Sequence, residues 1–204
     1  MKTFVQIGTN NGNDEFNEIV RLVKPDLVVL VEPNTSLIEE IVKNYDGVDN
    51  VHFTPVAIVG EKISQATMFI KSNMNKEGEL DGIRYDGGYS LLPLDDWGNE
   101  LDAMDVKTMT FTELCAEYDI THIDYLQIDT EGYDAEIIKS IDFDKVTIDV
   151  IKYEWWGFPE AMFTRHKDKD VLCGDKGMQF ITDKLIGLGY TLKRSRENII
   201  ARKY

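Results

Sequence analysis

The stretch FVQIGTNNG, residues 4–12, decides the fold, because an apolar run leads there into a turn that contains two glycines. Residues 4–7 are expected to form a β-strand, and a helix is expected to begin near Asp14. Glycine lets the backbone of such a turn approach a ligand closely. Glu32 ends a second apolar run about twenty positions later, where a carboxylate can accept hydrogen bonds from both ribose hydroxyls. Together the two segments predict a pocket for a nucleoside cofactor.

The spacing of the glycines narrows the choice of cofactor. Folds that bind dinucleotides use the triplet G-x-G-x-x-G to bring a pyrophosphate onto a helix N-terminus. Residues 8–13, GTNNGN, lack that triplet. S-adenosylmethionine, an adenosine with an amino-acid tail, needs only a tight turn with polar edges and is therefore the expected cofactor. A strand-turn-helix corner that binds nothing is the alternative interpretation, and Glu32 argues against it.

Length and composition favour one globular domain. The chain has 204 residues, of which 43% are hydrophobic and 29% are charged, and it is too short for two ordinary domains. The net charge of −15 argues against a nucleic-acid partner, because phosphate binding needs clustered Lys and Arg. Near the C-terminus lies a basic run that we expect to be a solvated edge: Lys193, Arg194, Arg196, Arg202 and Lys203.

Cysteine usage and hydropathy predict a cytoplasmic protein. Cys115 and Cys173 are far apart and lack C-x-x-C or zinc-site spacing, and we expect no secretory segment before the first strand. Both cysteines are therefore expected to be reduced thiols. No apolar run approaches the roughly 20 residues of a membrane span, so no membrane partner is expected.

Apolar periodicity predicts alternating strands and helices. Residues 27–31, LVVLV, are apolar throughout, which is typical of a strand buried on both faces of a parallel sheet. Thr35 is expected to cap the second helix. Strands are expected at 4–7, 27–31, 51–53, 123–128, 146–153, 190–192 and 198–201, and helices near 14–23, 35–46, 111–118, 134–141 and 178–188. This order predicts an α/β fold with a doubly wound, mostly parallel seven-stranded sheet and a C-terminal antiparallel hairpin.

Residues 55–105 interrupt this alternation. Turn residues gather at 76–78, 86–88 and 95–98, and only residues 67–70, TMFI, indicate an added edge strand. A long irregular segment inside a compact domain is usually functional. We therefore expect residues 1–204 to form a single domain with an irregular substrate-side insertion at about 55–105.

A second polar group follows the strand expected at 123–128. The stretch YLQIDTEGYD, residues 125–134, delivers Asp129 and Glu131 to the carboxyl edge of the sheet, where ligands bind in doubly wound folds. Residues two apart on an extended backbone point to the same side, so both carboxylates are expected to face one pocket and to titrate as a coupled pair. The alternative is that Asp129 caps a turn and Glu131 is solvated.

The order VQIGTNNGN, LVEPN and LQIDTEGYDAEII resembles the FkbM-type family of S-adenosylmethionine-dependent methyltransferases, over roughly residues 4–141. The resemblance implies a class I, Rossmann-like methyltransferase fold, bound S-adenosylmethionine, and methyl transfer, usually to oxygen. It also implies that Glu32 is the ribose acid. The remaining positions that match the family are Gly8, Asn10 and Gly12 in the loop, Asp129, Glu131 and Gly132 in the I-D-x-E-G signature, and Ser90 and Leu91 in a substrate-side segment.

Three positions depart from the family pattern. Gln6 stands where an acidic residue is common, Gln127 where a lysine is common, and Asp134 where a glutamate is common. Gln6 can still hydrogen-bond the amino group of the cofactor, although less strongly than a carboxylate would. These departures put the affinity for the cofactor in question.

The expected site residues form two sets. The catalytic candidates are Asp129, Glu131 and Glu154, which help an alcohol lose its proton. The cofactor-binding candidates are Gln6, Gly8, Thr9, Asn10, Gly12, Glu32, Pro33, Val56, Ala57 and Asp129. We assign no metal ligands, because His52, His122 and His166 are scattered and show no H-x-x-x-H pattern. Trp155 and Trp156 are expected to close a core rather than to wall a pocket.

The working hypothesis is therefore an O-methyltransferase that acts on a hydroxyl of a small molecule or glycan, with S-adenosylmethionine as cofactor. A non-catalytic binding module with a cofactor fold is the alternative that the departures at Gln6 and Gln127 leave open. A nicotinamide-dependent oxidoreductase is a lesser alternative, and the missing third glycine speaks against it.

Overall fold

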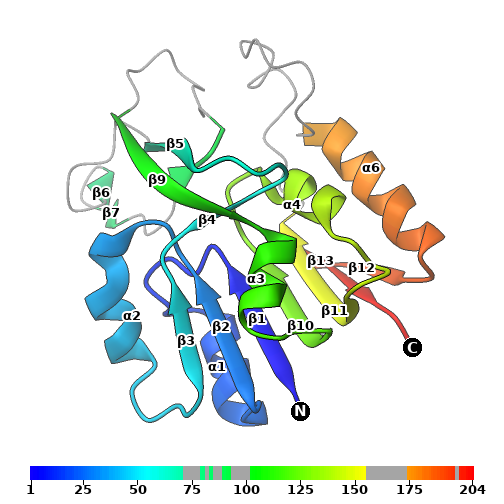
Figure 1. Ribbon diagram of the computed structural model, residues 1–204, viewed down its shortest axis with the longest axis horizontal. Helices are drawn as coiled ribbons and strands as arrows, with labels where there is room; N and C mark the ends of the chain where they lie inside the picture. Colours follow the sequence, from blue (N-terminus) through cyan, green and yellow to red (C-terminus); the bar gives the residue numbers. More distant parts are fainter. Residues whose placement is uncertain (71–78, 81–82, 85–88, 93–101, 155–173, 196–197) are drawn as a thin grey trace.

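The computed structural model describes residues 1–70, 79–80, 83–84, 89–92, 102–154, 174–195 and 198–204. A seven-stranded sheet dominates it, with the strand order β12-β13-β11-β10-β1-β2-β3 (Figure 1). Its strands are β1 (Thr3–Ile7), β2 (Leu27–Val31), β3 (Val51–Thr54), β10 (His122–Ile128), β11 (Thr147–Glu154), β12 (Thr191–Ser195) and β13 (Asn198–Arg202).

The sheet confirms the expected fold class. Strands β1, β2, β3, β10 and β11 are parallel to their neighbours in this group, whereas β13 is antiparallel to both β11 and β12. Ile7 pairs with Val31 on one side and with Ile128 on the other. Because this register aligns the carboxyl ends of three strands, the residues that follow them meet at one edge of the sheet.

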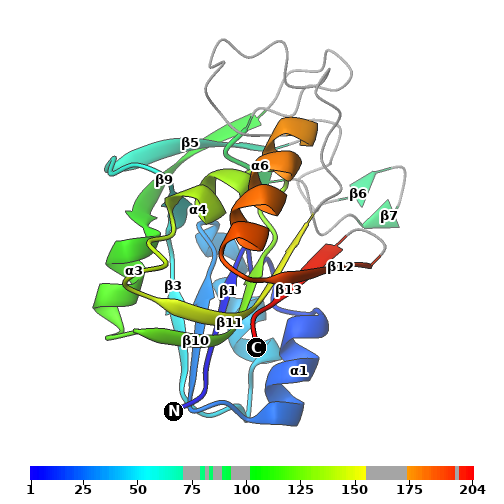
Figure 2. The same ribbon diagram turned by 90° about the vertical axis from the view of Figure 1, so that its right-hand side faces the viewer.

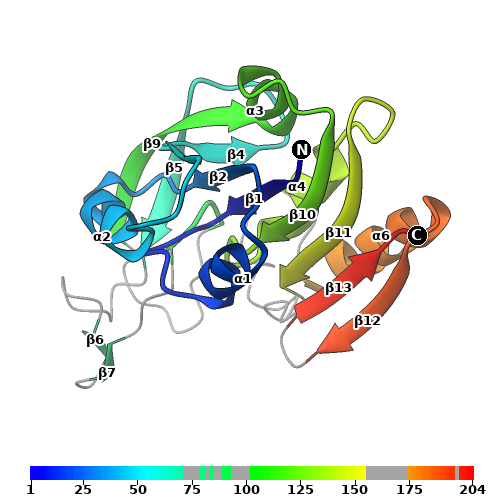
Figure 3. The same cartoon turned by 90° about the horizontal axis from the view of Figure 1, so that it is seen from below.

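Helices cover both faces of the sheet. Helices α1 (Glu15–Val23) and α2 (Ile38–Asn44) lie on one face. Helices α3 (Phe111–Glu117), α4 (Asp134–Ser140) and α6 (Gly174–Gly187) lie on the other. Figure 3, which looks from below, separates these two outer layers, and Figure 2 shows α6 beside the terminal hairpin.

Two apolar clusters hold these layers together. All five residues of β1 and all five of β2 are buried, which confirms the burial on both faces expected of a continuous apolar strand. Phe4 packs with Phe16 toward α1, whereas Val5 and Ile7 join the larger cluster beneath α3, α4 and α6. The alternation of side chains along β1 therefore serves both faces.

The ends of the first two helices follow local capping rules. The Asp14 side chain accepts a hydrogen bond from the Asn17 backbone N–H (3.1 Å) and caps α1. The expected Thr35 cap is wrong: Asn34 caps a short 3₁₀ turn, Thr35–Leu37, from which α2 continues. Asn34 is the cap because its side-chain oxygen, Oδ1, accepts a hydrogen bond from the Ser36 N–H, two residues along the chain (3.1 Å).

A second sheet occupies much of the segment that was expected to be irregular. It has the order β4-β9-β5-β8, with β4 (Ala57–Val59), β9 (Asp102–Thr110), β5 (Gln65–Ile70) and β8 (Tyr89–Ser90). Two further strands, β6 (Glu79–Leu80) and β7 (Ile83–Arg84), pair with each other. Strand β5 pairs with β9 on one side and β8 on the other, so the expected edge strand at 67–70 is an inner one. Periodicity missed this sheet because β4 and β8 are short and because β5 and β9 pair across a long separation in sequence.

Several expected features lie outside the described residues, namely Cys173, Trp155, Trp156, His166 and the turn residues at 76–78, 86–88 and 95–98. Cys115 is a buried free thiol on α3. Within the part of the chain that the structure covers, no helix combines the length and the apolarity that a membrane crossing requires.

Candidate active site

A cavity opens where the carboxyl ends of β1, β2 and β10 face the second sheet. The space inside it, including the part open to solvent, is about 1030 Å³. The main sheet and the loops that follow its strands contribute Ile7, Gly8, Thr9, Asn10, Asn11, Asn13, Asp14, Val31, Glu32, Pro33, Asp129, Thr130, Glu131 and Tyr133. The segment from Val56 onward contributes Val56, Ala57, Ile58, Met68, Tyr89, Ser90 and Leu91.

Gly8 makes the narrowest contact in the turn after β1. Its φ angle is +81°, and a Cβ atom there would lie 1.8 Å from the carbonyl oxygen of Asp129. No side chain fits in that space, so the backbone of β1 and that of the loop after β10 touch directly. The Gly8 N–H donates to the Val31 carbonyl (3.0 Å), which also ties the turn to β2.

Gly12 has a structural role instead of lining the cavity. Its φ angle is +73°, and a Cβ there would lie 2.9 Å from the ring of Tyr45. The Gly12 carbonyl accepts a hydrogen bond from the Asn17 side chain (3.0 Å). Gly12 therefore lets the loop pack against α1 and α2, and the cavity wall is made by its neighbours Asn11 and Asn13.

Glu32 is a buried carboxylate held by the backbone. One oxygen accepts from the Asn10 N–H and the other from the Asn34 N–H, both at 2.9 Å. Burial raises the pKa of Glu32, and these two hydrogen bonds act in the opposite direction. Each carboxylate oxygen has two lone pairs. One on each oxygen therefore remains for a diol such as the ribose 2′- and 3′-hydroxyls.

Asp14 is a cavity residue that sequence reasoning saw only as a helix start. One of its oxygens caps α1, and the other accepts a hydrogen bond from the Gln6 side-chain amide. Gln6 itself is fully buried and does not line the cavity. Gln6 was predicted to contact the cofactor, but its side chain lies behind the cavity wall. There Gln6 holds Asp14, and Asp14 presents its carboxylate to the cavity.

A row of buried polar residues runs beneath this region. Gln6, Gln127 and Lys152 are neighbours across β1, β10 and β11 in register. The Lys152 ammonium binds Glu15 at 2.6 Å, at the start of α1. Among the described residues, the side-chain oxygens of Gln6 and Gln127 have no hydrogen-bond partner. The row provides one buried positive charge close to the acidic groups of the cavity.

Asp129 and Glu131 both line the cavity, but the extended backbone assumed for them is wrong. Strand β10 ends at Ile128, and Glu131 has a positive φ angle of 54°. The two side chains share the cavity because the loop turns sharply at Glu131 and Gly132. The Asp129 N–H donates to the Ile7 carbonyl (2.9 Å), which fixes this loop against β1.

The surroundings of Asp129 raise its pKa to about 7. Loss of hydration is the largest cause, followed by the charges of Asp134, Glu131 and Asp14, and the Lys152 charge acts in the opposite direction. The Asp129 side chain is exposed because it borders the open cavity, and water there weakens the shift. The charges of the three neighbouring carboxylates shift the pKa of Asp129 in the same upward direction. Such a group exchanges a proton near neutral pH.

Glu154 does not line the cavity, in contrast to its predicted catalytic role. Its backbone N–H donates to one oxygen of Asp134 (3.0 Å), and the other Asp134 oxygen accepts from the Thr130 N–H (3.0 Å). Asp134 is buried and thereby ties the loop after β10 to the end of β11. The end of β11 therefore supports the site through its backbone.

The second sheet forms the opposite wall of the cavity. The Ser90 hydroxyl donates to the Glu131 carbonyl (2.9 Å) and accepts from the Leu92 N–H (3.0 Å). Burial and the Glu32 charge raise the pKa of Tyr89, which places this tyrosine near the ribose acid. Met68 of β5 adds an apolar surface. Val56, Ala57, Ser90 and Leu91 were expected here, whereas Met68 and Tyr89 were not, because only tertiary packing brings them to the cavity.

The residues present fit S-adenosylmethionine. Glu32 offers paired oxygens for the ribose, Gly8 and Asn10 keep the backbone close, and Asp14 offers a carboxylate for the cationic amino group. An adenine ring needs apolar sides, and these are provided by Val31, Pro33, Val56 and Ile58. At two of the three departures from the family pattern, a neighbour carries the charge that the family residue would have: Gln6 donates to the Asp14 carboxylate, and Gln127 pairs with Lys152 on the next strand.

Several solved structures resemble the chain. Fibrillarin of the fibrillarin/Nop5p complex is 9% identical with a TM-score of 0.47, and the match covers 100% of this chain and 72% of that one. Precorrin-6y C5,15-methyltransferase from Geobacter metallireducens is 14% identical, with a TM-score of 0.45 and coverage of 99% and 81%. TrmK of M. capricolum, in complex with S-adenosyl-homocysteine, is 12% identical, with a TM-score of 0.43 and coverage of 99% and 62%.

No curated protein matches the chain significantly. The family model described as the methyltransferase FkbM domain matches residues 6–192, which include the turn after β1, Glu32 and the loop after β10. With the fold, the cavity and the cofactor-binding groups in agreement, the nicotinamide alternative is set aside. The chain belongs to the FkbM methyltransferase family and is an S-adenosylmethionine-dependent methyltransferase.

Proposed function

We propose that the protein transfers a methyl group to a hydroxyl oxygen of a small molecule or glycan. The observation that carries the proposal is the position of Asp129, which borders the cavity next to Gly8 and shares its loop with Glu131. Its pKa of about 7 lets it accept a proton at neutral pH.

The chemistry needs alignment and one proton transfer. S-adenosylmethionine, when bound, supplies an electrophilic methyl group. An alcohol acceptor must lose its proton as the new bond forms, and an ionised Asp129 accepts that proton. Glu131 contributes by raising the pKa of Asp129 through its charge. The walls of the cavity hold the acceptor in line with the methyl group, and alignment of this kind can be worth about 7–11 kcal/mol.

The charge of the cavity supports an acceptor without anionic groups. Asp14, Glu32, Asp129 and Glu131 all line it, and among the described lining residues there is no Lys or Arg. A phosphorylated or otherwise anionic acceptor would be repelled. A neutral hydroxyl compound or an uncharged sugar can instead hydrogen-bond to the phenols of Tyr89 and Tyr133. Nucleic acid is disfavoured as a partner for the same reason.

The proposal extends to the organisation and location of the protein. We take residues 1–204 as one methyltransferase domain whose second sheet selects the acceptor, because that sheet supplies Met68, Tyr89 and Ser90 to the cavity. A cytoplasmic location is consistent with the buried free thiol of Cys115. Both statements stay predictions.

The experiment is a transfer assay with a panel of phenols, neutral sugars and glycosides, and with matched phosphorylated and amine compounds. The readout is S-adenosylhomocysteine, and NMR of the product distinguishes an O-methyl from an N-methyl group. Asp129→Asn should lower kcat by about 10²–10⁴-fold, the usual contribution of a general base, while cofactor affinity changes little. Asp46→Asn, on an exposed position away from the cavity, is the matched control.

Two results would contradict the proposal. Full turnover by Asp129→Asn would remove the assigned role of that residue, and exclusive N-methylation would replace the acceptor class. Cofactor binding without turnover of any acceptor would favour the non-catalytic binding module.

A further inference from the structure

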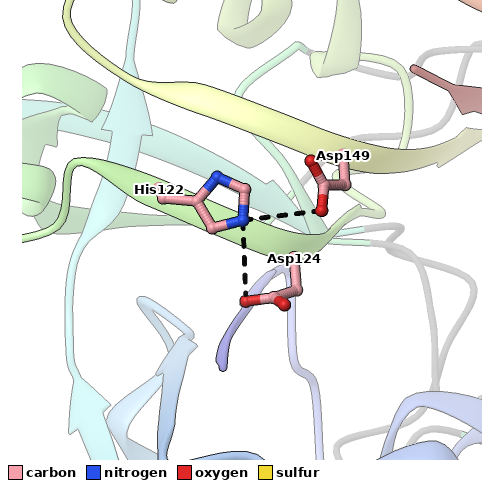
Figure 4. A group of neighbouring side chains, drawn as sticks. All are labelled: His122, Asp124 and Asp149. Atoms are coloured by element: carbon pink, nitrogen blue, oxygen red, sulfur yellow. Dashed lines mark ion pairs between the residues drawn. The ribbon is translucent and has the colours of Figure 1, made fainter. Parts of the chain in front are cut away.

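Three side chains meet at the end of the sheet opposite the cavity. His122 and Asp124 are the first and third residues of β10, and Asp149 lies near the start of the neighbouring strand β11. One nitrogen or oxygen from each residue lies within 4.8 Å of the others (Figure 4). No spacing along the chain predicts this group, because the register of two parallel strands brings Asp149 beside His122.

Hydrogen bonds behind the group fix the orientation of the imidazole. The Thr147 hydroxyl donates to the Thr121 carbonyl (3.4 Å), and its oxygen lies 2.8 Å from His122 Nδ1. The Thr147 oxygen therefore accepts the Nδ1–H proton. This arrangement assigns the lone pair of the neutral ring to Nε2, the nitrogen that faces both carboxylates.

The aspartate oxygen is oriented as well. Asp124 Oδ2 accepts the backbone N–H of Thr3 at 2.7 Å, which holds the carboxylate at the start of β1. A histidine whose second nitrogen is hydrogen-bonded and a carboxylate held by a backbone N–H are the usual supports of metal ligands. The neutral Nε2 lone pair and two carboxylates repel one another, and either a proton on Nε2 or a metal ion between the three groups relieves this repulsion.

The spacing suits an interposed ion. His122 Nε2 lies 3.5 Å from Asp149 Oδ2 and 3.9 Å from Asp124 Oδ2. Direct hydrogen bonds between such groups measure about 2.7–2.9 Å. Zinc bonds of about 2.0–2.2 Å at tetrahedral angles separate two ligand atoms by about 3.3–3.6 Å. The group therefore needs only a small closure to hold zinc, with exposed side chains that leave room for water as a fourth ligand.

We propose that His122, Asp124 and Asp149 form a surface site for a divalent transition-metal ion of the zinc type. An imidazole with two carboxylates matches the ligand preference of such ions. The site links β10 to β11 and, through Thr3, to β1, at the amino ends of the strands. It is independent of the cofactor cavity, which opens at their carboxyl ends.

The test is a titration of the metal-free protein with Zn²⁺ alone, followed calorimetrically, and with Co²⁺, whose absorption spectrum reports tetrahedral coordination. His122→Ala and Asp149→Asn should each weaken Zn²⁺ binding at least about tenfold, and Thr147→Val should weaken it less. His52→Ala is the matched control, because His52 is an exposed histidine on β3, another strand of the same sheet. Circular dichroism and S-adenosylmethionine binding verify that each variant is folded.

One equivalent of Zn²⁺ bound by the unchanged protein and by His52→Ala, and lost in the two ligand variants, supports the site. Absence of Zn²⁺ binding to the unchanged protein overturns it, since His122 is then only a proton-bearing partner of the two aspartates. Equal binding in His122→Ala also overturns it. Thr147→Val adds a finer readout, because it removes a partner that orients a ligand and leaves all three ligands in place.

Discussion

The two ends of β10 carry groups of the same acidic residue type in opposite environments. At the carboxyl end, Asp129 borders the cavity near Glu131 and Asp134, and its pKa is raised to about 7. At the amino end, Asp124 and Asp149 surround a histidine at the surface. Neighbouring like charges prepare the first group to exchange protons, whereas an imidazole beside two carboxylates prepares the second to bind a cation. Surroundings, more than residue type, decide what a carboxylate does.

The largest effect is expected from Gly8→Ala. This substitution should remove the cofactor site at the carboxyl end of β10 and leave the group of His122, Asp124 and Asp149 unchanged. The new Cβ would lie 1.8 Å from the Asp129 carbonyl oxygen, so β1 and the loop after β10 must separate. We expect S-adenosylmethionine binding to be lost and the melting temperature to fall by about 6–12 °C, equivalent to about 3 kcal/mol. Calorimetry and thermal unfolding measure both.

Gly47→Ala is the matched control for that substitution. Gly47 has a similar φ angle, +73°, but nothing lies within 4 Å of its added Cβ. It should cost only the backbone strain of about 1–2 kcal/mol and should leave the cofactor affinity unchanged. Equal losses in the two variants would show that the close contact at Gly8 is not what shapes the cavity.

Glu32→Ala should weaken S-adenosylmethionine binding by about 100-fold, or about 2.7 kcal/mol. The change removes both acceptors expected for the ribose and leaves the N–H groups of Asn10 and Asn34 without their partner. Calorimetric titration gives the affinity, and Glu39→Ala, on the exposed side of α2, is the control. Zn²⁺ binding at the other end should not change, and an unaltered cofactor affinity would refute the ribose role.

The next effect in size is expected in the pH dependence of turnover, which reports on Asp129 at the carboxyl end of β10. If ionised Asp129 is the base, kcat/KM should rise about tenfold between pH 6 and pH 8, because a group with pKa of about 7 ionises over that range. An active Asp129→Asn variant should lose this rise. A profile that is flat for the unchanged protein would assign the proton transfer elsewhere.

Stability should change with pH in the opposite sense. The folded-state pKa of Asp129 lies above its ordinary value of 3.8, so the folded state binds more protons between about pH 4 and pH 7. The contribution of this group to stability is therefore greatest at low pH and falls as pH rises through that window. The melting temperature of Asp129→Asn relative to the unchanged protein should accordingly increase from pH 5 to pH 8.

The smallest effect is expected from Gln6→Met, which tests the support of Asp14. Methionine fills a similar volume but cannot donate to the Asp14 carboxylate. It also removes the Gln6 oxygen that has no partner among the described residues. We expect cofactor affinity to fall by about threefold to tenfold, while unfolding free energy changes by less than about 1 kcal/mol. A large loss of stability with unchanged affinity would make Gln6 a purely structural residue.

Much of this molecule could be predicted from its sequence. Continuous apolar runs such as 27–31 specify strands buried on both faces, and Asp14, which is the N-cap of α1, marks a helix start. The positions of Gly8 and Glu32 directly after two such strands predict a nucleoside pocket, because parallel strands end at the same edge. These are local properties, and they were sufficient for the fold class and for most of the cofactor side.

Only the tertiary structure decided the remainder. Tyr89 and Met68 reach the cavity through pairing of β5 with β8 and β9, and Asp149 reaches His122 through strand register. Spacing places Glu154 at the right edge of the sheet but does not show that its backbone binds Asp134 or that it lies outside the lining of the cavity. Gln6 likewise acts through Asp14. Sequence fixes which elements form, whereas the neighbours of a side chain, and hence its charge state and chemistry, depend on contacts between residues distant along the chain.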